Sequence, residues 1–339
     1  MDKESKVSRT LDIYTLLNEG KVINIGEKAE TYRVDERSIQ RDIRSIRDFL
    51  EDYGDGHAAG RREVLYDEKM GGYVMSDARD SVMTNGEILA VSKILLESRA
   101  FTKDEISAIL DKMIAGCVPY KNMKLVSELI ANEKFHYVET RQHAHIQDKI
   151  WELGEEIKQS NLLELVYKKQ VSAKETVTRI VHPVAILFSE YYFYLNAYIV
   201  EQDEKGRDAY QYDYPTVFRI DRIESYKETG RKYKIRYADR FEEGEFRKRT
   251  QFMYPGKLTR LVFRYTGRNV EAILDRLPTA KITAQEPDGA GYTIEAEVYG
   301  TGILMWLLSQ GSTVEVIGPE EMREKMRKVL EKMLAMYGE

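Results

Sequence analysis

The sequence predicts an α+β multidomain protein. Its 339 residues are enough for two to three separately packed cores. Helical and strand patterns come in successive blocks: three short helices with a hairpin, then helices alone, then consecutive strands, and finally strands mixed with helices. Such blocks are typical of α+β domains that pack separately. We place the domains at residues 1–80, 81–160, 161–235 and 250–339.

The composition is that of a soluble globular protein, with 42% hydrophobic and 32% charged residues. No stretch reaches the roughly 18 apolar residues of a membrane-spanning helix, and the opening M-D-K-E-S-K lacks an apolar signal region. We therefore expect no membrane partner and a cytoplasmic location. The single cysteine, Cys117, fits a reducing compartment. Because the net charge is -5, any basic surface must be local.

Three helices are predicted at the start of the chain. Apolar residues from Val7 to Leu17 recur at helical spacing, and a second short helix is expected over residues 25–32. Asp35 is a candidate N-cap for a third helix over residues 36–53. Its apolar residues form a narrow seam that is expected to pack inward: Ile39, Ile43, Ile46 and Leu50.

The other faces of this third helix are basic and polar. They supply the candidate DNA-binding residues Arg37, Ser38, Gln40, Arg41, Arg44 and Arg47. Guanidinium and amide groups suit phosphates and base edges, and residues near the N-terminus of a recognition helix are the ones that meet the bases.

A hairpin is predicted directly after these helices. Residues 61–66, 67–72 and 73–75 have the pattern of strand, turn and strand, with Gly71 and Gly72 in the turn. Together with this hairpin, the stretch V-D-E-R-S-I-Q-R-D-I resembles the recognition helix of winged helix-turn-helix regulators. That resemblance implies binding of double-stranded DNA.

A solvated arginine face is the alternative for the third helix. Residues 1–75 carry 13 Lys or Arg against 16 Asp or Glu, so this region is not basic overall. Asp42 and Asp48 also lie at helical spacing from arginines with which they could pair. If the region does bind DNA, we expect weak non-specific affinity, with base contacts providing more of the discrimination.

The middle of the chain is predicted to be helical. Thr84 with Glu87, and Thr102 with Glu105, have the spacing of capping boxes at two helix starts. Further helices are expected over residues 121–133 and 142–159, and the whole segment is interpreted as a spacer, a dimer interface or both. A homodimer is the expected assembly. His136, His143 and His145 are interpreted as surface or interface residues and not as metal ligands, because no thiolate or ordered carboxylate pattern accompanies them.

Four strand signals follow. Residues 162–168 alternate in polarity, and residues 177–188, 191–200 and 216–223 are rich in β-branched and aromatic side chains. Short polar breaks separate these runs, beginning with Ser189-Glu190. Consecutive strands with polar turns predict a small, strongly bent antiparallel sheet or barrel.

Three motifs on these strands resemble those of the WYL-domain transcriptional regulators. The triplet Phe193-Tyr194-Leu195 is similar to the family's Trp-Tyr-Leu, with Phe in place of Trp. Arg179 and Pro183 match the arginine and proline before the preceding strand, and residues 218–223, F-R-I-D-R-I, match its F-R-x-D-R-I ending. The chain departs from the family again at Thr216, where many members carry a basic residue. The resemblance implies a small Sm-like bent β-barrel, the WYL domain, that senses nucleotides or nucleic-acid fragments.

The candidate ligand-binding residues on this sheet are Arg179, His182, Tyr194, Arg219 and Arg222. Forked guanidinium donors beside an aromatic face suit a phosphate and a base. Arg179 and His182 are three residues apart, as are Arg219 and Arg222, so strand alternation alone does not put either pair on one face. A bulge or a strand end is required for that.

Internal ion pairing is the alternative for the two later arginines. Asp213, Asp221 and Glu224 are near enough in sequence to pair with Arg219 or Arg222 across the sheet. The arginines would then serve only to solvate it.

The last 90 residues predict a ferredoxin-like α/β sandwich. Strand and helix patterns follow in the order βαββαβα, and Pro319 opens the final helix. Its expected buried stripe consists of Met322, Met326, Val329, Leu330, Met333 and Leu334. Trp306 in the preceding helix, with Gly311 beyond it, resembles the C-terminal extension of WYL regulators.

The sequence therefore predicts a DNA-binding transcriptional regulator. No G-x-S-x-G, H-E-x-x-H or phosphate-loop motif is present, so we expect no enzymatic activity and no cofactor. The predicted partners are double-stranded DNA and a nucleotide or single-stranded nucleic-acid effector. The alternative is a non-catalytic accessory protein that binds RNA or single-stranded DNA through the arginine-bearing sheet, with its N-terminal helices acting as an adaptor.

Overall fold

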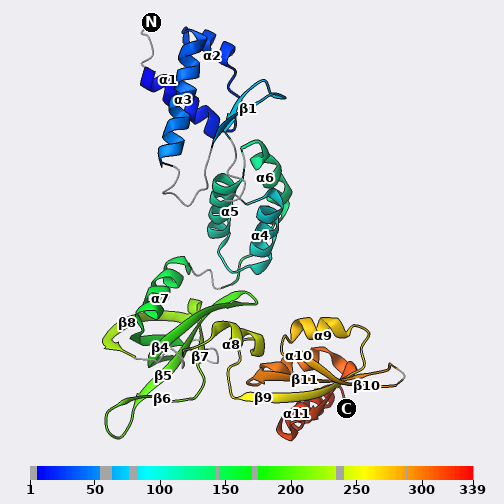
Figure 1. Cartoon of the computed structure of the whole chain (residues 1–339). Coiled ribbons are helices and arrows are strands. Elements are labelled where there is room, and N and C mark those ends of the chain that lie inside the picture. Colours follow the sequence, from blue (N-terminus) through cyan, green and yellow to red (C-terminus); the bar gives the residue numbers. More distant parts are fainter. Residues whose placement is uncertain are drawn as a thin grey trace. The chain divides into compact units, whose positions relative to one another are not determined.

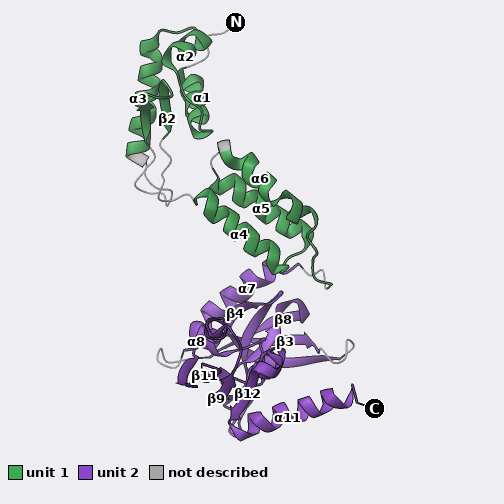
Figure 2. Cartoon of the chain, turned by 90° about the vertical axis from the view of Figure 1, so that its right-hand side faces the viewer, with its two compact units in different colours: residues 1–141 green, residues 142–339 purple. Residues whose placement is uncertain are grey.

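The computed structural model describes residues 6–53, 63–75, 83–118, 120–141, 145–169, 175–233, 240–287 and 289–338. Figure 1 shows their helices and strands, and Figure 2 shows the two compact units, residues 1–141 and 142–339. Helices combine with three antiparallel sheets, which confirms the α+β class. Arg61, Arg62 and His143 lie outside the described residues.

The first unit opens with three helices and a hairpin. These are α1 (Lys6–Asn18), α2 (Ile25–Tyr32), α3 (Glu36–Tyr53), β1 (Val64–Asp67) and β2 (Gly72–Met75). The predicted seam of α3 is confirmed, since Ile39, Ile43 and Ile46 are buried and Leu50 packs against them. Ile23 adds a bridge to Tyr73 of the hairpin. Gly72 is required there, because a Cβ at this position would lie 2.6 Å from a Val22 methyl group.

Three helices complete this unit: α4 (Asn85–Ser98), α5 (Lys103–Cys117) and α6 (Tyr120–Phe135). Both predicted capping boxes are present, at Thr84 and at Thr102. The helices share one apolar core, which includes Ile88, Leu110 and Ile130.

The second unit begins with α7 (Gln147–Gln159), which packs against β4. The sheet behind it contains β3 (Asn161–Lys168), β4 (Thr176–Ser189), β5 (Tyr192–Gln202), β6 (Asp208–Tyr210), β7 (Thr216–Arg219) and β8 (Ile223–Lys232). The strand order is β6-β5-β4-β3-β8, with β7 also paired to β5. We name this the sensor sheet.

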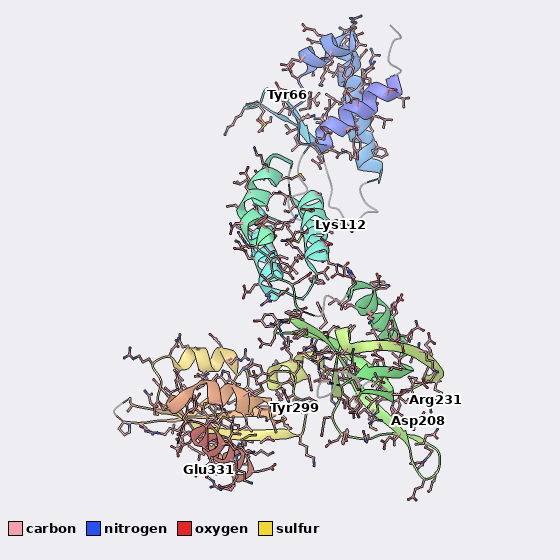
Figure 3. All side chains as sticks on the ribbon, turned by 180° about the vertical axis from the view of Figure 1, so that it is seen from behind. Tyr66, Lys112, Asp208, Arg231, Tyr299 and Glu331 are labelled. Carbon is pink, nitrogen blue, oxygen red and sulfur yellow. The ribbon has the colours of Figure 1, made fainter. Side chains whose placement is uncertain are left out.

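The sensor sheet bends but does not close into the predicted barrel within the described residues. The run predicted as one strand over residues 216–223 is broken by a 3-10 turn at Ile220–Arg222, so β7 pairs with β5 and β8 pairs with β3. The two edge strands, β6 and β8, are joined by side-chain contacts and not by backbone hydrogen bonds between described residues. Arg231 of β8 donates to Asp208 of β6 (2.6 Å), both labelled in Figure 3, and Tyr233 stacks on Tyr210.

After α8 (Glu243–Arg249), the chain forms a four-stranded antiparallel sheet with helices. Its elements are β9 (Leu258–Tyr265), α9 (Val270–Arg276), β10 (Lys281–Gln285), β11 (Tyr292–Tyr299), α10 (Gly302–Ser309), the 3-10 turn Gly311–Thr313, β12 (Val314–Gly318) and α11 (Glu320–Ala335). The order of elements is βαββαβα, and the strand order is β10-β11-β9-β12. Phe263, Trp306 and Leu307 lie in its core.

The predicted buried stripe of α11 is right at its start and wrong at its end. Met322 and Met326 are buried and Val329 is half-buried, whereas three side chains are exposed: Leu330, Met333 and Leu334. α11 packs on β12 and α10. Because the helix has 16 residues and β12 only five, its last turns run past the surface that covers the first ones.

Candidate functional site

The outer face of α3 carries exposed arginine and glutamine side chains. Asp35 caps the helix, as predicted: its carboxylate accepts the Ser38 N–H (2.7 Å), and this bond holds the pKa of Asp35 below its usual value. Ser38 itself is half-buried in the first turn. The exposed row, which we name the α3 row, consists of Arg37, Gln40, Arg41 and Arg44. Within the described residues, none of its arginines forms an ion pair.

Arg47 differs from the α3 row. Its Nε donates to the Val64 carbonyl (2.8 Å), and its guanidinium lies 5.3 Å from the centre of the Tyr73 ring. The structure therefore places this predicted DNA-binding residue against the hairpin, where it joins α3 to β1 and β2.

The alternative that Asp42 pairs with arginines of α3 is not what the structure shows. Asp42 is fully buried and faces α1, where it accepts from Arg9 Nε (2.5 Å) and from the Thr10 hydroxyl (3.0 Å). Asp48 is exposed and pairs with none of the residues that the structure describes. Both carboxylates leave the α3 row free.

One face of β5 carries the polar part of the sensor sheet. Alternation along the strand puts Tyr192, Tyr194, Asn196 and Tyr198 on this face. Arg219 of β7 lies directly opposite Tyr194, so two of the five candidate ligand-binding residues are cross-strand neighbours. Burial raises the pKa of Tyr194 to about 12, despite the opposing effect of the Arg219 charge.

Arg219 is held by partners inside the sheet. Its Nε and Nη2 donate to the two carboxylate oxygens of Asp221 (3.1 and 2.6 Å), and its Cζ lies 3.3 Å from the centre of the Tyr192 ring. The side chains of Arg219 and Asp221 are only 14% and 9% exposed. The Asp221 pairing that the sequence left open is therefore present for Arg219.

Arg179 and Arg222 are not joined to this pair. Arg179 is exposed and lies opposite Leu165, eight residues along β4 from the partner of Tyr194, which is Leu187. Among the described residues, its guanidinium donates to the carbonyl of the preceding residue, Thr178, and to no other partner. Arg222 is half-buried at the end of the 3-10 turn and forms no ion pair with a described residue.

His182 belongs to a separate aromatic stack. It lies opposite Tyr198, its Nδ1 is 2.8 Å from the Tyr210 hydroxyl, and its ring stacks on Tyr233. Burial lowers the pKa of His182 to about 4, so the ring is neutral at physiological pH. A neutral, buried imidazole does not attract an anion.

Two residues of the β5 face were missed from sequence: Tyr192, which carries the Arg219 guanidinium, and Asn196, which is fully buried. Side chains two residues apart on a strand lie on the same face, so Tyr192 and Asn196 share the face of Tyr194. This alternation could have identified both from the sequence.

Neither a metal-binding cluster nor a membrane-spanning helix is found among the described residues. Across the described ranges, no group of three or more His, Cys, Asp or Glu side chains is arranged to hold a metal ion. Among the same residues, no helix combines the length and the apolar character needed to cross a membrane.

Two domain families match the sequence: the WYL domain over residues 151–228 and the WCX domain over residues 257–334. Among solved structures, Proteasome accessory factor B/C (PafBC) of Arthrobacter aurescens is 18% identical with a TM-score of 0.31; the match covers 98% of this chain and 48% of that one, so this chain spans about half of its length. A CRISPR Cas-related protein is 14% identical with a TM-score of 0.36, and the match covers 98% and 81% of the two chains. No curated protein matches.

Proposed function

The chain belongs to the WYL-domain transcription regulators, and we propose that it binds operator DNA through α3 and senses a nucleotide or nucleic-acid fragment on its WYL domain. The α3 row carries this proposal. Its guanidinium groups are exposed and form no ion pair with a residue that the structure describes. They lie on a helix whose opposite face is held by a buried apolar seam and by the Arg9–Asp42 pair.

DNA recognition depends on what the α3 row can donate. Exposed guanidinium forks bind phosphates, or the O6 and N7 acceptors of guanine, and Gln40 can bind the adenine edge. The hairpin supports the helix through Arg47. A homodimer that puts two such helices into successive major grooves would read two half-sites about one helical turn apart.

Effector sensing depends on a competition for Arg219. A phosphate group and the Asp221 carboxylate are both bidentate acceptors for a guanidinium. If the phosphate of a nucleotide displaced Asp221, the base of that nucleotide would lie beside Tyr192 and Tyr194, on the same face of β5. This changes operator binding only if the two states of the dimer bind the effector with different affinities.

The test is a selection from random duplex DNA with the full chain, followed by mass spectrometry of small molecules and nucleic acids released on denaturation. Enrichment of one duplex sequence supports a regulator. Retention of RNA or single-stranded DNA without any duplex enrichment would support the accessory-protein alternative and overturn this proposal. Neither function requires catalysis.

A further inference from the structure

A cavity of about 400 Å³ lies between β5, the turn before β7, α8 and the end of β11. We name it the aromatic pocket. Its walls include the rings of Tyr198, Tyr214, Phe246 and Tyr299, the last of which is labelled in Figure 3. Its volume is in the range of small-molecule sites in proteins, which is about 300–1,000 Å³.

Neighbouring rings hold these walls in place. Phe246 and Tyr299 are stacked with centres 5.5 Å apart. Tyr198 is stacked on Tyr210 at 4.2 Å, and Tyr214 on Tyr212 at 5.5 Å. Burial, together with Tyr299 and Asp213, raises the pKa of Tyr198, so that its ring stays uncharged at neutral pH. The pocket is therefore lined by neutral aromatic rings that neighbouring rings hold in place.

The charged residues of the aromatic pocket are mainly acidic: three carboxylates, on Asp213, Glu242 and Glu245, against one guanidinium, on Arg240. Asp213 and Glu242 form no side-chain hydrogen bond or ion pair with a described residue. Ion pairs with Lys248 and Arg249 lower the pKa of Glu245 to about 2, so it is ionised. Arg240 already has an interaction of its own. An anion would meet net repulsion here.

A buried amide, Asn196, lies near this pocket in sequence, on the same face of β5 as Tyr198. Asn196 is fully buried, and neither its Oδ1 nor its Nδ2 has a hydrogen-bond partner among the described residues. It shares the face of β5 with Tyr198, two residues away, and its cross-strand partner Val217 packs into the cluster that contains Phe246 and Tyr299.

We propose that the aromatic pocket binds a small organic cation, a protonated or quaternary amine. Neutral aromatic faces attract cations through their quadrupoles, and unpaired carboxylates at the same site add charge attraction. An ammonium bound in the pocket can lie near the aromatic rings and near the carboxylates of Asp213 and Glu242. This site lies apart from Arg219 and takes the opposite charge, so it does not depend on the proposed nucleotide effector.

The residues around the pocket suggest what binding would do. Tyr198 and Tyr214 belong to the WYL domain, Phe246 to the linking helix α8, and Tyr299 to the WCX domain. A ligand that contacts all of them would hold α8 against the sensor sheet. Binding should therefore stabilise residues 142–339 as a unit.

The test is calorimetric titration of the full chain with choline, and with its uncharged isostere 3,3-dimethylbutan-1-ol. Choline should bind saturably at one site, and the isostere at least about tenfold more weakly, since the two differ chiefly in the cation–π and charge terms. Adenosine monophosphate should not compete with choline. Equal binding of choline and the isostere, or no binding of choline, overturns the proposal.

Charge-neutral variants connect the binding to this pocket. The double variant Asp213→Asn, Glu242→Gln keeps the side-chain shapes at exposed positions and should weaken choline binding about tenfold. Glu224→Gln changes an exposed carboxylate on β8 that pairs with no described residue, and it should leave choline binding unchanged. Unchanged binding in the double variant overturns the proposal. Arg219→Gln should not alter choline affinity, so failure of the nucleotide proposal and failure of this one are distinguishable.

Discussion

Arginines on α3 and on the sensor sheet have the same side chain but different availability. Arg37, Arg41 and Arg44 are exposed and unpaired within the described residues. Arg219 is nearly covered, stacked on Tyr192 and bound at two atoms by Asp221. The first set can bind a phosphate without breaking an ion pair that the structure describes. Arg219 must release the Asp221 carboxylate before it can bind another anion, and in the proposed mechanism this exchange is the step that would change the sheet.

The buried pair behind the α3 row gives the largest expected effect. Asp42→Ala would leave Arg9, which is 8% exposed, without its partner. Removing one member of a buried ion pair costs about 3–5 kcal/mol, because a charge is left uncompensated. We expect the free energy of unfolding of the first unit to fall by this amount in urea denaturation. Asp48→Ala, on the exposed side of the same helix, should change it by less than about 0.5 kcal/mol.

Equal effects at Asp42 and Asp48 would contradict the contrast between a supported inner face and a free outer face of α3. In that case Asp48, and with it part of the α3 row, would also be in a pairing that stabilises the fold.

The stability of the sensor sheet should fall in acid because His182 is buried in it. The pKa of His182 is lowered to about 4 from an ordinary 6.5, so the unfolded chain takes up this proton first as the pH falls. Stability from this group is complete above about pH 6.5 and is lost progressively down to about pH 4, by about 3 kcal/mol at 1.36 kcal/mol for each pKa unit. His182→Phe keeps a ring in the stack and should remove this part of the pH dependence of unfolding. An identical slope in both proteins would contradict it.

The competition at Arg219 predicts two changes of opposite sign. Arg219→Gln removes the charge and the fork, and should weaken binding of adenosine monophosphate or a short oligonucleotide about 10–100-fold, since hydrogen bonds to charged groups contribute about 1.5–3 kcal/mol. Asp221→Asn weakens the internal competitor and should tighten the same binding several-fold. Fluorescence titration of the full chain measures both.

A matched control is Arg207→Gln, which alters an exposed arginine paired with Asp203 in the turn after β5 and should leave effector affinity unchanged. If Asp221→Asn weakened binding as much as Arg219→Gln does, the pair would be a structural clamp and not a competitor for the ligand.

The helix caps were predictable from the sequence, but the ion-pair partners of the charged side chains were not. The Asp35 cap and both capping boxes follow from short-range spacing, which the rest of the fold does not disturb. The 3-10 turn at Ile220–Arg222 lies within a run that the sequence predicts as one strand, and its residue types alone do not mark the break.

Tertiary contacts decided what the pattern left open. Asp42 was read as a helical neighbour of arginines on α3, but its partner comes from α1, 33 residues earlier. The stripe of α11 had the right period, yet a helical period says nothing about where the covering surface ends, so Leu330 and Leu334 are exposed. Asp221 was foreseen as one of several partners for Arg219, and only the folded turn selects it.

The smallest expected effect comes from the exposed row itself. Arg41→Ala should weaken binding of the selected duplex about tenfold or less, because one exposed contact is lost, and should reduce the salt dependence of binding by about one unit of slope if that contact is a phosphate. Unfolding should be unchanged, and so should effector affinity. Lys6→Ala removes an exposed cation from α1 and serves as the control. If both variants weakened duplex binding equally at every salt concentration, the attraction would be general to the basic side chains of the first unit, and α3 would have no special part in reading DNA.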